Sequence, residues 1–292
     1  MDSIKFCDLH CDTAMDILGG ADLAKQQTQV NIEFMREGQL GLQLFACYQP
    51  PAIPESHRAR IVMEMLEKLK DEIAQHPDDM MPCLNATDAR TALEQDKIGA
   101  VFTIENGMAI ENDLSKLDMF YEKGVRLLTI AHAESHDWAL SSNDLNPHFD
   151  GLTPFREKVI TAMNEMGMMI DLSHSHDKTV EKVLQISTKP VLATHSCVHS
   201  LCPTKRNLKD ELIKKIADNG GLIGINFYPG FLDSQYLALV EKRAGNLFAN
   251  LSQMERQAGT DINKITRMFA EFRSKLKNIM ADARIPIDRV VE

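Results

Sequence analysis

Short apolar runs rich in strand-forming residues recur along the chain and alternate with amphipathic stretches. Each run predicts a strand, and the seven runs occupy residues 5–12, 41–48, 98–107, 124–132, 167–174, 190–196 and 221–229. The stretch at residues 56–76 has the 3.6-residue period of an amphipathic helix. Its apolar stripe consists of Val62, Met65, Leu66, Leu69 and Ile73. Helices that alternate with apolar strands predict a parallel sheet covered by helices.

Seven strand–helix units in 292 residues favour an α/β fold of the TIM type, a (β/α)8 barrel, over an open doubly wound sheet. No Gly-x-Gly-x-x-Gly follows the first strand, which argues against a dinucleotide site. Residues 233–283 form a long amphipathic region that predicts a helical excursion, and no eighth strand follows it. We expect one barrel domain over residues 1–292. Because the eighth strand is missing, either the sequence is a fragment or the sheet closes in another way.

The charge and the apolar content exclude several classes of partner. The net charge is -10, and Lys and Arg form no cluster, so neither nucleic acid nor an anionic membrane surface is an expected partner. No apolar run reaches the ~18–20 residues of a membrane span, and the N-terminus lacks the pattern of a signal peptide. The six cysteines are scattered, as is typical of reduced thiols. We therefore expect a cytoplasmic protein.

Residues able to bind metal gather at the ends of the predicted strands, where TIM-type barrels place their ligands. His10 and Asp12 are two positions apart, so on a strand they point to the same face. A single histidine at a strand end is more often a core or turn residue, but five of six strand ends repeat the pattern. These residues are His10, Asp12, Glu105, His132, His174 and His195.

This set exceeds the four ligands of one tetrahedral zinc ion. It suits two ions roughly 3.5–4 Å apart that share a bridging carboxylate and a water. Imidazole ligands favour Zn²⁺ over Mg²⁺ or Ca²⁺, while Mn²⁺, Fe²⁺ and Co²⁺ stay open. A water shared by two such ions ionises near neutral pH, so the predicted chemistry is hydrolysis of a carbonyl or phosphoryl compound.

The sequence around these residues resembles that of the membrane dipeptidase (renal dipeptidase) family of zinc peptidases. The similar stretches cover most of residues 6–232, and the longest begins with GLTPF at residue 151 and ends at His174. They read DLHCDT, TIENG, GVRLLTIAH, GLTPF with VITAMNEMGMMIDLSH, PVLATHS, and KRNLKDELI with GGLIGINFYPGFL.

The resemblance implies a role for each ligand. His10 and Asp12 would bind one zinc ion, and Glu105 would bridge both ions. His174 and His195 would bind the second ion. The chain would accordingly hold two Zn²⁺ ions.

The resemblance also implies that His132 is no ligand but contacts the substrate carbonyl and stabilises the developing oxyanion. Arg206 would pair with the free carboxylate of a dipeptide, whose geometry matches a guanidinium. Without the resemblance, we would expect Arg206 to be a surface residue that caps a helix starting near Asn207. Two departures stand out: the family has glycine where this chain has Asn106, and the family's eighth-strand aspartate, which handles a proton, is absent.

The sequence therefore predicts a binuclear zinc dipeptidase that hydrolyses small dipeptides through a metal-bridging hydroxide. One alternative is another amidohydrolase-like barrel acting on lactones, phosphotriesters or cyclic amides, although such enzymes usually carry His-x-His on strand one. A second alternative is a truncated, inactive relative that retains its metal site. Relatives are commonly dimers, so a homodimer using residues 233–283 is also expected.

Overall fold

The computed structural model describes residues 5–147, 149 and 153–291. The ends of the expected domain and the first two residues of the GLTPF stretch, 151 and 152, lie outside the described residues. Internal contacts divide the chain into two compact units. The first unit comprises Met1–Gln49 and Pro54–Leu128, and the second comprises Pro50–Ile53 and Thr129–Glu292.

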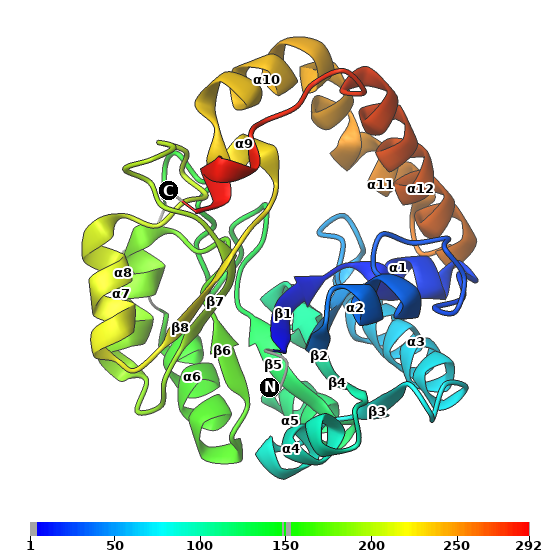
Figure 1. Cartoon of the computed structure of the whole chain (residues 1–292). Coiled ribbons are helices and arrows are strands. Elements are labelled where there is room, and N and C mark those ends of the chain that lie inside the picture. The colour runs from blue at the N-terminus through cyan, green and yellow to red at the C-terminus, as the bar shows by residue number, and fades with distance from the viewer. Residues whose placement is uncertain (1–4, 148, 150–152, 292) are drawn as a thin grey trace. The chain divides into compact units, whose positions relative to one another are not determined.

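Strands and helices alternate along most of the chain (Figure 1). The strands are β1 (Phe6–Cys11), β2 (Leu40–Tyr48), β3 (Met80–Pro82), β4 (Ile98–Glu105), β5 (Val125–Thr129), β6 (Met169–Asp171), β7 (Leu192–Ser196) and β8 (Leu222–Ile225). The helices are α1 (Thr13–Leu18), α2 (Ile32–Glu37), α3 (Glu55–Ala74), α4 (Ala86–Glu94), α5 (Leu114–Glu122), α6 (Pro154–Met166), α7 (Asp177–Ile186), α8 (Asp210–Asp218), α9 (Pro229–Leu232), α10 (Ser234–Ala249), α11 (Leu251–Ala258) and α12 (Ile262–Ile279). Two 3-10 helices, η1 (Gly107–Ile110) and η2 (Ile287–Val290), complete the described elements.

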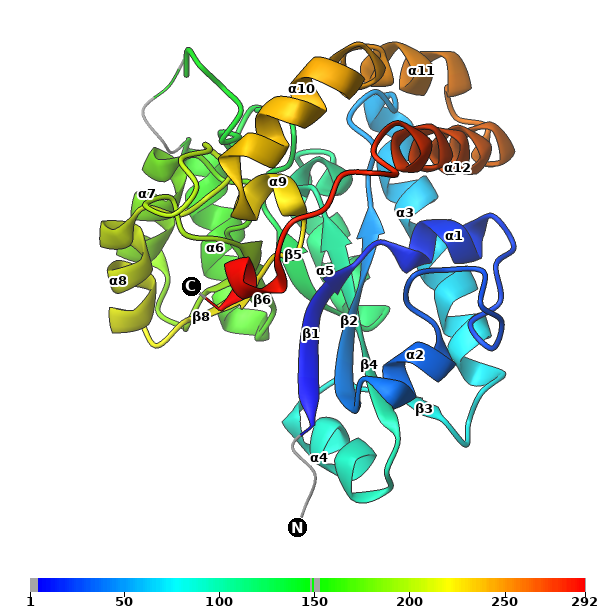
Figure 2. The same cartoon turned by 45° about the horizontal axis from the view of Figure 1, so that its top comes forward.

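In the first unit, β1 pairs with β2 and β2 pairs with β4, in both cases in parallel. The register between β2 and β4 places Tyr48 opposite Glu105, so the two strands end at the same edge. Every residue of β4 is buried, which explains its continuous apolar run. Helix α3, against which α1 packs (Figure 2), buries the predicted apolar stripe completely.

In the second unit, β6, β7 and β8 are parallel neighbours. Helix α7 lies between α6 and α8, with which it makes contact (Figure 1). After β8 the chain continues through α9–α12, and a small apolar cluster forms among these helices. Val240 and Ala244 of α10 pack there against Met280, which follows α12.

All seven predicted strands are present, as β1, β2 and β4–β8, and the α/β class is confirmed. The additional strand β3 pairs with β4 and has three residues, too few to show an apolar period. Among described residues after Ile225, none forms a further strand. Within the described part of the chain, no helix combines the length and the apolar character that a membrane crossing needs.

Candidate metal centre

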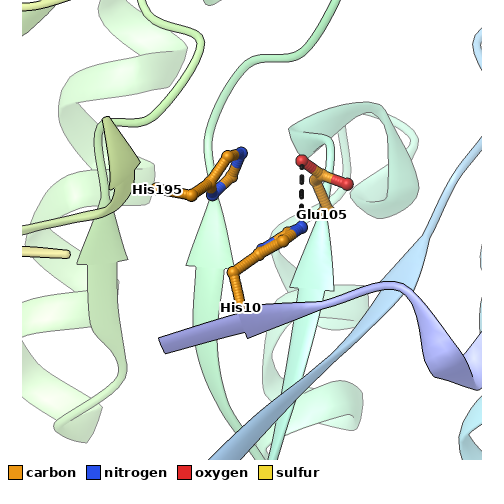
Figure 3. A group of neighbouring side chains, drawn as sticks. All are labelled: His10, Glu105 and His195. Atoms are coloured by element: carbon orange, nitrogen blue, oxygen red, sulfur yellow. Dashed lines mark ion pairs between the residues drawn. The ribbon is translucent and has the colours of Figure 1, made fainter. Parts of the chain in front are cut away.

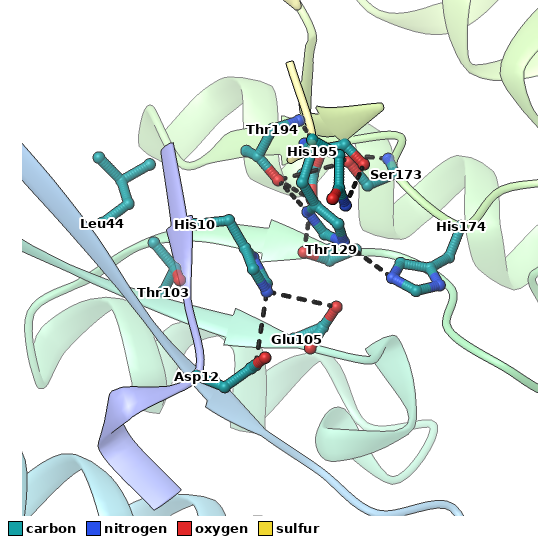
Figure 4. A network of polar contacts seen from close by, with 12 residues as sticks. His10, Asp12, Leu44, Thr103, Glu105, Thr129, Ser173, His174, Thr194 and His195 are labelled. Atoms are coloured by element: carbon teal, nitrogen blue, oxygen red, sulfur yellow. Dashed lines mark hydrogen bonds and ion pairs between the residues drawn. The ribbon is translucent and has the colours of Figure 1, made fainter. Parts of the chain in front are cut away.

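The first unit brings together three of the predicted ligands. His10 lies near the end of β1, Asp12 follows that strand, and Glu105 is the last residue of β4. The Nε2 atom of His10 lies 3.7 Å from Oε1 of Glu105 (Figure 3). The same atom lies 3.4 Å from Oδ1 of Asp12 (Figure 4). Glu105 is buried and Asp12 is largely exposed. One imidazole between two carboxylates is a donor set that suits a zinc ion.

Asn106, which follows Glu105, occupies a backbone conformation that usually requires glycine. Its φ is 92°, in the left-handed half of the map, where asparagine is among the better tolerated side chains. Its Nδ2 donates to the carbonyl of Gln49 over 3.0 Å, and its Oδ1 accepts from the amide of Met108 over 3.2 Å. The departure from the family's glycine is therefore compatible with a backbone of positive φ at this turn.

The second unit brings together the three remaining histidines. Nε2 of His174 lies 2.8 Å from Nε2 of His195 (Figure 4). The ring of His132 lies 4.2 Å from that of His174 between centroids. His195 is buried, whereas His132 and His174 are partly exposed. At this distance the two nitrogens can share a proton in a hydrogen bond, and as neutral rings both are of the type that binds zinc.

His174 also has a left-handed backbone, with φ at 65°. Its carbonyl accepts a hydrogen bond from the amide of Ser142 over 2.7 Å, and the amide of Ser175 donates to the carbonyl of Leu172 over 3.0 Å. These contacts keep the turn after β6 in this conformation. Non-glycine residues in this region cost about 1–3 kcal/mol and are concentrated at functional sites.

A buried carboxylate that the sequence analysis missed, Asp171, supports both histidine strands. It accepts from the hydroxyl of Thr129 over 2.6 Å, and from the amide and hydroxyl of Ser173 over 3.1 and 2.9 Å. It also accepts from the amide and hydroxyl of Thr194, both over 2.8 Å. The Thr194 hydroxyl lies 2.8 Å from Nδ1 of His195 and so orients that ring. An acidic residue inside the apolar run GMMIDLSH was the available signal.

Arg206 lies against the strand that carries His195. Its Nη2 donates to the carbonyl of His195 over 3.0 Å, and its guanidinium lies 5.3 Å from the ring centroid of Phe231. Arg206 is 8% exposed, and the next helix, α8, begins only at Asp210. It is therefore a buried residue beside the histidine group and not a surface cap.

A further group of ligand-type side chains in the first unit, Asp22, Glu72 and His76, joins a loop to a helix. Nε2 of His76 lies 3.2 Å from Oε1 of Glu72, and the same oxygen accepts from the amide of Leu23 over 2.7 Å. Asp22, the third member, pairs with Lys25 over 2.7 Å. These contacts hold the segment after α1 against the end of α3.

The carboxyl group of Glu255, on α11 in the second unit, has a raised pKa. It is 3% exposed, and burial, with a smaller contribution from Glu134, raises its pKa from 4.5 to about 7 despite Arg256. Between pH 4.5 and about 7, Glu255 therefore stays protonated in the folded protein, whereas it is ionised in the unfolded chain. As a result, the free energy of unfolding falls as the pH rises from 4.5 to about 7.

Glu255→Gln removes this pH-dependent loss of stability. We expect it to raise the free energy of unfolding by about 2–3 kcal/mol at pH 8 and to change it little at pH 4. Urea unfolding at both pH values measures the difference, with the exposed Glu241→Gln on α10 as the control. An equal effect of Glu255→Gln at the two pH values would show that the carboxyl does not titrate in this way.

Comparisons with known proteins agree with the geometry. The membrane dipeptidase family, peptidase family M19, matches residues 1–270. Dipeptidase 3 of Mus musculus is 32% identical over 216 residues, which cover 73% of this chain and 43% of that protein. The chain thus spans less than half the length of this relative.

Two solved structures resemble the chain over nearly its whole length. The dipeptidase AC, a metallo peptidase of family M19, has a TM-score of 0.73 at 21% identity and covers 93% of this chain and 92% of its own. A metallo peptidase from Rhodobacter sphaeroides, liganded with a phosphinate mimic of the dipeptide L-Ala-D-Ala, has a TM-score of 0.73 at 20% identity, covering 99% and 96%. These likenesses confirm the TIM-type α/β fold.

The family match therefore extends over all the strands and over every residue of both histidine and carboxylate groups. The chain belongs to the membrane dipeptidase family, peptidase family M19.

Proposed function

We propose that this chain is a binuclear zinc dipeptidase that hydrolyses the peptide bond of small dipeptides. The observation that carries the proposal is the pair of imidazole nitrogens of His174 and His195, which face each other at 2.8 Å in a turn with a left-handed backbone. The left-handed turn costs about 1–3 kcal/mol, as is common at functional sites. Both nitrogens lie within hydrogen-bond distance of each other and are of the type that binds zinc. The family supplies the kind of reaction, since its members are named dipeptidases.

The proposed ligands follow the family resemblance. His10 and Asp12 would hold one zinc ion, His174 and His195 would hold the other, and Glu105 would be shared by both. The support is the gathering of side chains within each unit that is described above. When bound, the two ions lower the pKa of a shared water and so supply the nucleophile for hydrolysis.

The remaining groups would orient the substrate. His132 is proposed to contact the carbonyl oxygen of the scissile bond, next to the ring of His174. Arg206 is proposed to pair with the free carboxylate of the dipeptide. A carboxylate bound so close to the scissile bond would exclude longer peptides. The dipeptide mimic bound by the Rhodobacter sphaeroides protein supports a substrate of this size.

Arg206→Met tests the carboxylate contact. We expect kcat/KM for a dipeptide to fall by about 10–100-fold, because a hydrogen bond to a charged group contributes about 1.5–3 kcal/mol. The wild type should also prefer a free dipeptide over its C-terminal amide, and the variant should lose that preference. Zinc content serves as the control, since Arg206 also contacts the carbonyl of His195. An unchanged preference for the free acid in the variant would rule out this role.

The function itself is tested by hydrolysis of a panel that contains dipeptides, tripeptides, lactones and phosphotriesters. We expect cleavage of dipeptides alone, its loss after chelation and its return with zinc. Cleavage of lactones or phosphotriesters instead would favour another amidohydrolase-like activity. Bound zinc without any hydrolysis would favour an inactive relative with a retained metal site.

The proposal also includes a single hydrolase domain over residues 1–292, a cytoplasmic location and assembly into a homodimer. All six cysteines are free thiols, and five of them are buried, which suits a reducing compartment. The acidic net charge of -10 argues against nucleic acid and anionic membranes as partners. Light scattering on the purified chain measures the mass of the assembly, and a monomeric mass would exclude the dimer.

A further inference from the structure

Arg156 is a fully buried cation in the first turn of α6. Its exposed fraction is 0%. Its Nε, Nη1 and Nη2 atoms have no hydrogen-bond partner among the residues that the structure describes. Arginine offers five N–H donors and no acceptor, so the whole hydrogen-bonding capacity of this side chain is unused.

A guanidinium in this state is costly to the fold. Burial lowers the pKa of Arg156 to about 9, so the group is still charged at neutral pH. An unpaired buried charge or donor destabilises the fold, and folded proteins nearly always provide a partner. The contact seen is with the ring of Phe149, 5.4 Å from the guanidinium carbon, and an aromatic face does not replace five hydrogen bonds. The missing partner must therefore be an acceptor.

The surroundings of Arg156 favour an anion as that acceptor. Side chains on a helix lean toward its N-terminus, and Phe149 precedes α6, so the guanidinium lies on the N-terminal side of this 13-residue helix. Thr153, the N-cap residue, makes no side-chain capping bond, and its Oγ1 is buried without a partner within the described part of the chain. The helix dipole favours an anion at this end, although Pro154 in the first turn has no N–H to offer.

A second buried donor lies close to this turn. The ring of Trp138 meets that of Phe155, the neighbour of Arg156, with centroids 6.2 Å apart. The indole Nε1 is buried and also lacks a hydrogen-bond partner among the described residues. An indole can only donate. Around the start of α6, the buried atoms without a partner among the described residues are therefore all able to donate: the nitrogens of Arg156, Nε1 of Trp138 and the hydroxyl of Thr153.

We propose that Arg156 and the N-terminus of α6 form a binding site for a small carboxylate anion. This site goes beyond the proposed dipeptidase function and uses none of its residues. A carboxylate matches the fork of a guanidinium with two parallel hydrogen bonds. Its single negative charge neutralises Arg156, whereas a phosphate dianion would leave a net charge beside the ring of Phe149. Chloride lacks the two acceptor atoms that the fork requires.

The test is calorimetric titration of the purified protein with acetate at constant ionic strength, with chloride and inorganic phosphate as comparison anions. We expect saturable acetate binding at Arg156 that Arg156→Met abolishes. Arg156→Lys, which keeps the charge but not the fork, should weaken it by about tenfold. Lys158→Met, which removes an exposed charge from the same helix, should leave it unchanged. The Arg206→Met variant should retain this binding, which separates it from the proposed substrate contact.

Three results would overturn the proposal, and none depends on the hydrolytic activity. The first is acetate binding by the wild type no stronger than that of chloride. The second is an equal loss in Arg156→Met and Lys158→Met, which would indicate only a general charge effect. The third is tighter binding of phosphate than of acetate. Should Arg156→Met fail to fold, the wild type and Arg156→Lys still decide the outcome.

Discussion

Substitution of His174 by alanine is expected to abolish dipeptide hydrolysis and to release zinc from the chain. Nε2 of His174 faces Nε2 of His195 at 2.8 Å, so the variant would leave a single imidazole where two are proposed to hold one ion. Substitutions in the shell outside the ligands already cost roughly 10–100-fold in metal affinity or activity. Loss of a ligand itself should exceed that range. Zinc content and kcat/KM of the variant measure both effects.

Two further variants make this result specific. His176→Ala removes a neighbouring imidazole, the N-cap of α7, whose Nδ1 accepts from the amide of Lys178 over 3.1 Å. It should cost about 1 kcal/mol of stability and leave zinc and activity in place. His174→Gly should be as inactive as His174→Ala but more stable by about 1 kcal/mol, because φ at this position is 65°. Full activity of His174→Ala would exclude His174 as a ligand.

Asp171→Ala is expected to lower the free energy of unfolding by about 3–5 kcal/mol. The carboxylate is fully buried and accepts five hydrogen bonds, from Thr129, Ser173 and Thr194. Its removal would leave buried donors without acceptors, which is the costly case. Since Thr194 also contacts Nδ1 of His195, zinc affinity should fall by about 10–100-fold as well. Urea unfolding and zinc titration measure the two effects.

A matched pair of variants checks this account. Asp171→Asn keeps one acceptor oxygen and should recover part of the stability. Asp177→Ala removes an aspartate from the start of α7 that pairs with Lys209 on the surface, and it should cost less than about 1 kcal/mol. If Asp171→Ala were no more destabilising than Asp177→Ala, the hydrogen-bond network would not stabilise the fold as argued.

Much of the fold could be predicted because long apolar runs carry a clear signal. Strand β4 is buried along its whole length, and the apolar run at residues 98–107 predicted it almost to the residue. The stripe of α3 was equally plain. Strand β3 could not be found, since three residues show no period and only its pairing with β4 defines it.

The predicted ligands are recognisable because strand ends place them, but their supports come from distant parts of the chain. Asp171 is bonded to Thr129, 42 residues earlier, and to Thr194, 23 residues later. Nothing near Asp171 in sequence indicates those partners. The left-handed backbone of His174 and the unpaired guanidinium of Arg156 likewise depend on packing that a local pattern does not record.

The zinc content of the purified chain, measured by mass spectrometry beside dipeptide hydrolysis, tests the central claim most directly. We predict close to two zinc ions per chain in the wild type, cleavage that chelation abolishes, and loss of zinc in His174→Ala. A chain that binds no zinc, or that keeps its full zinc content in His174→Ala, would contradict the proposed centre.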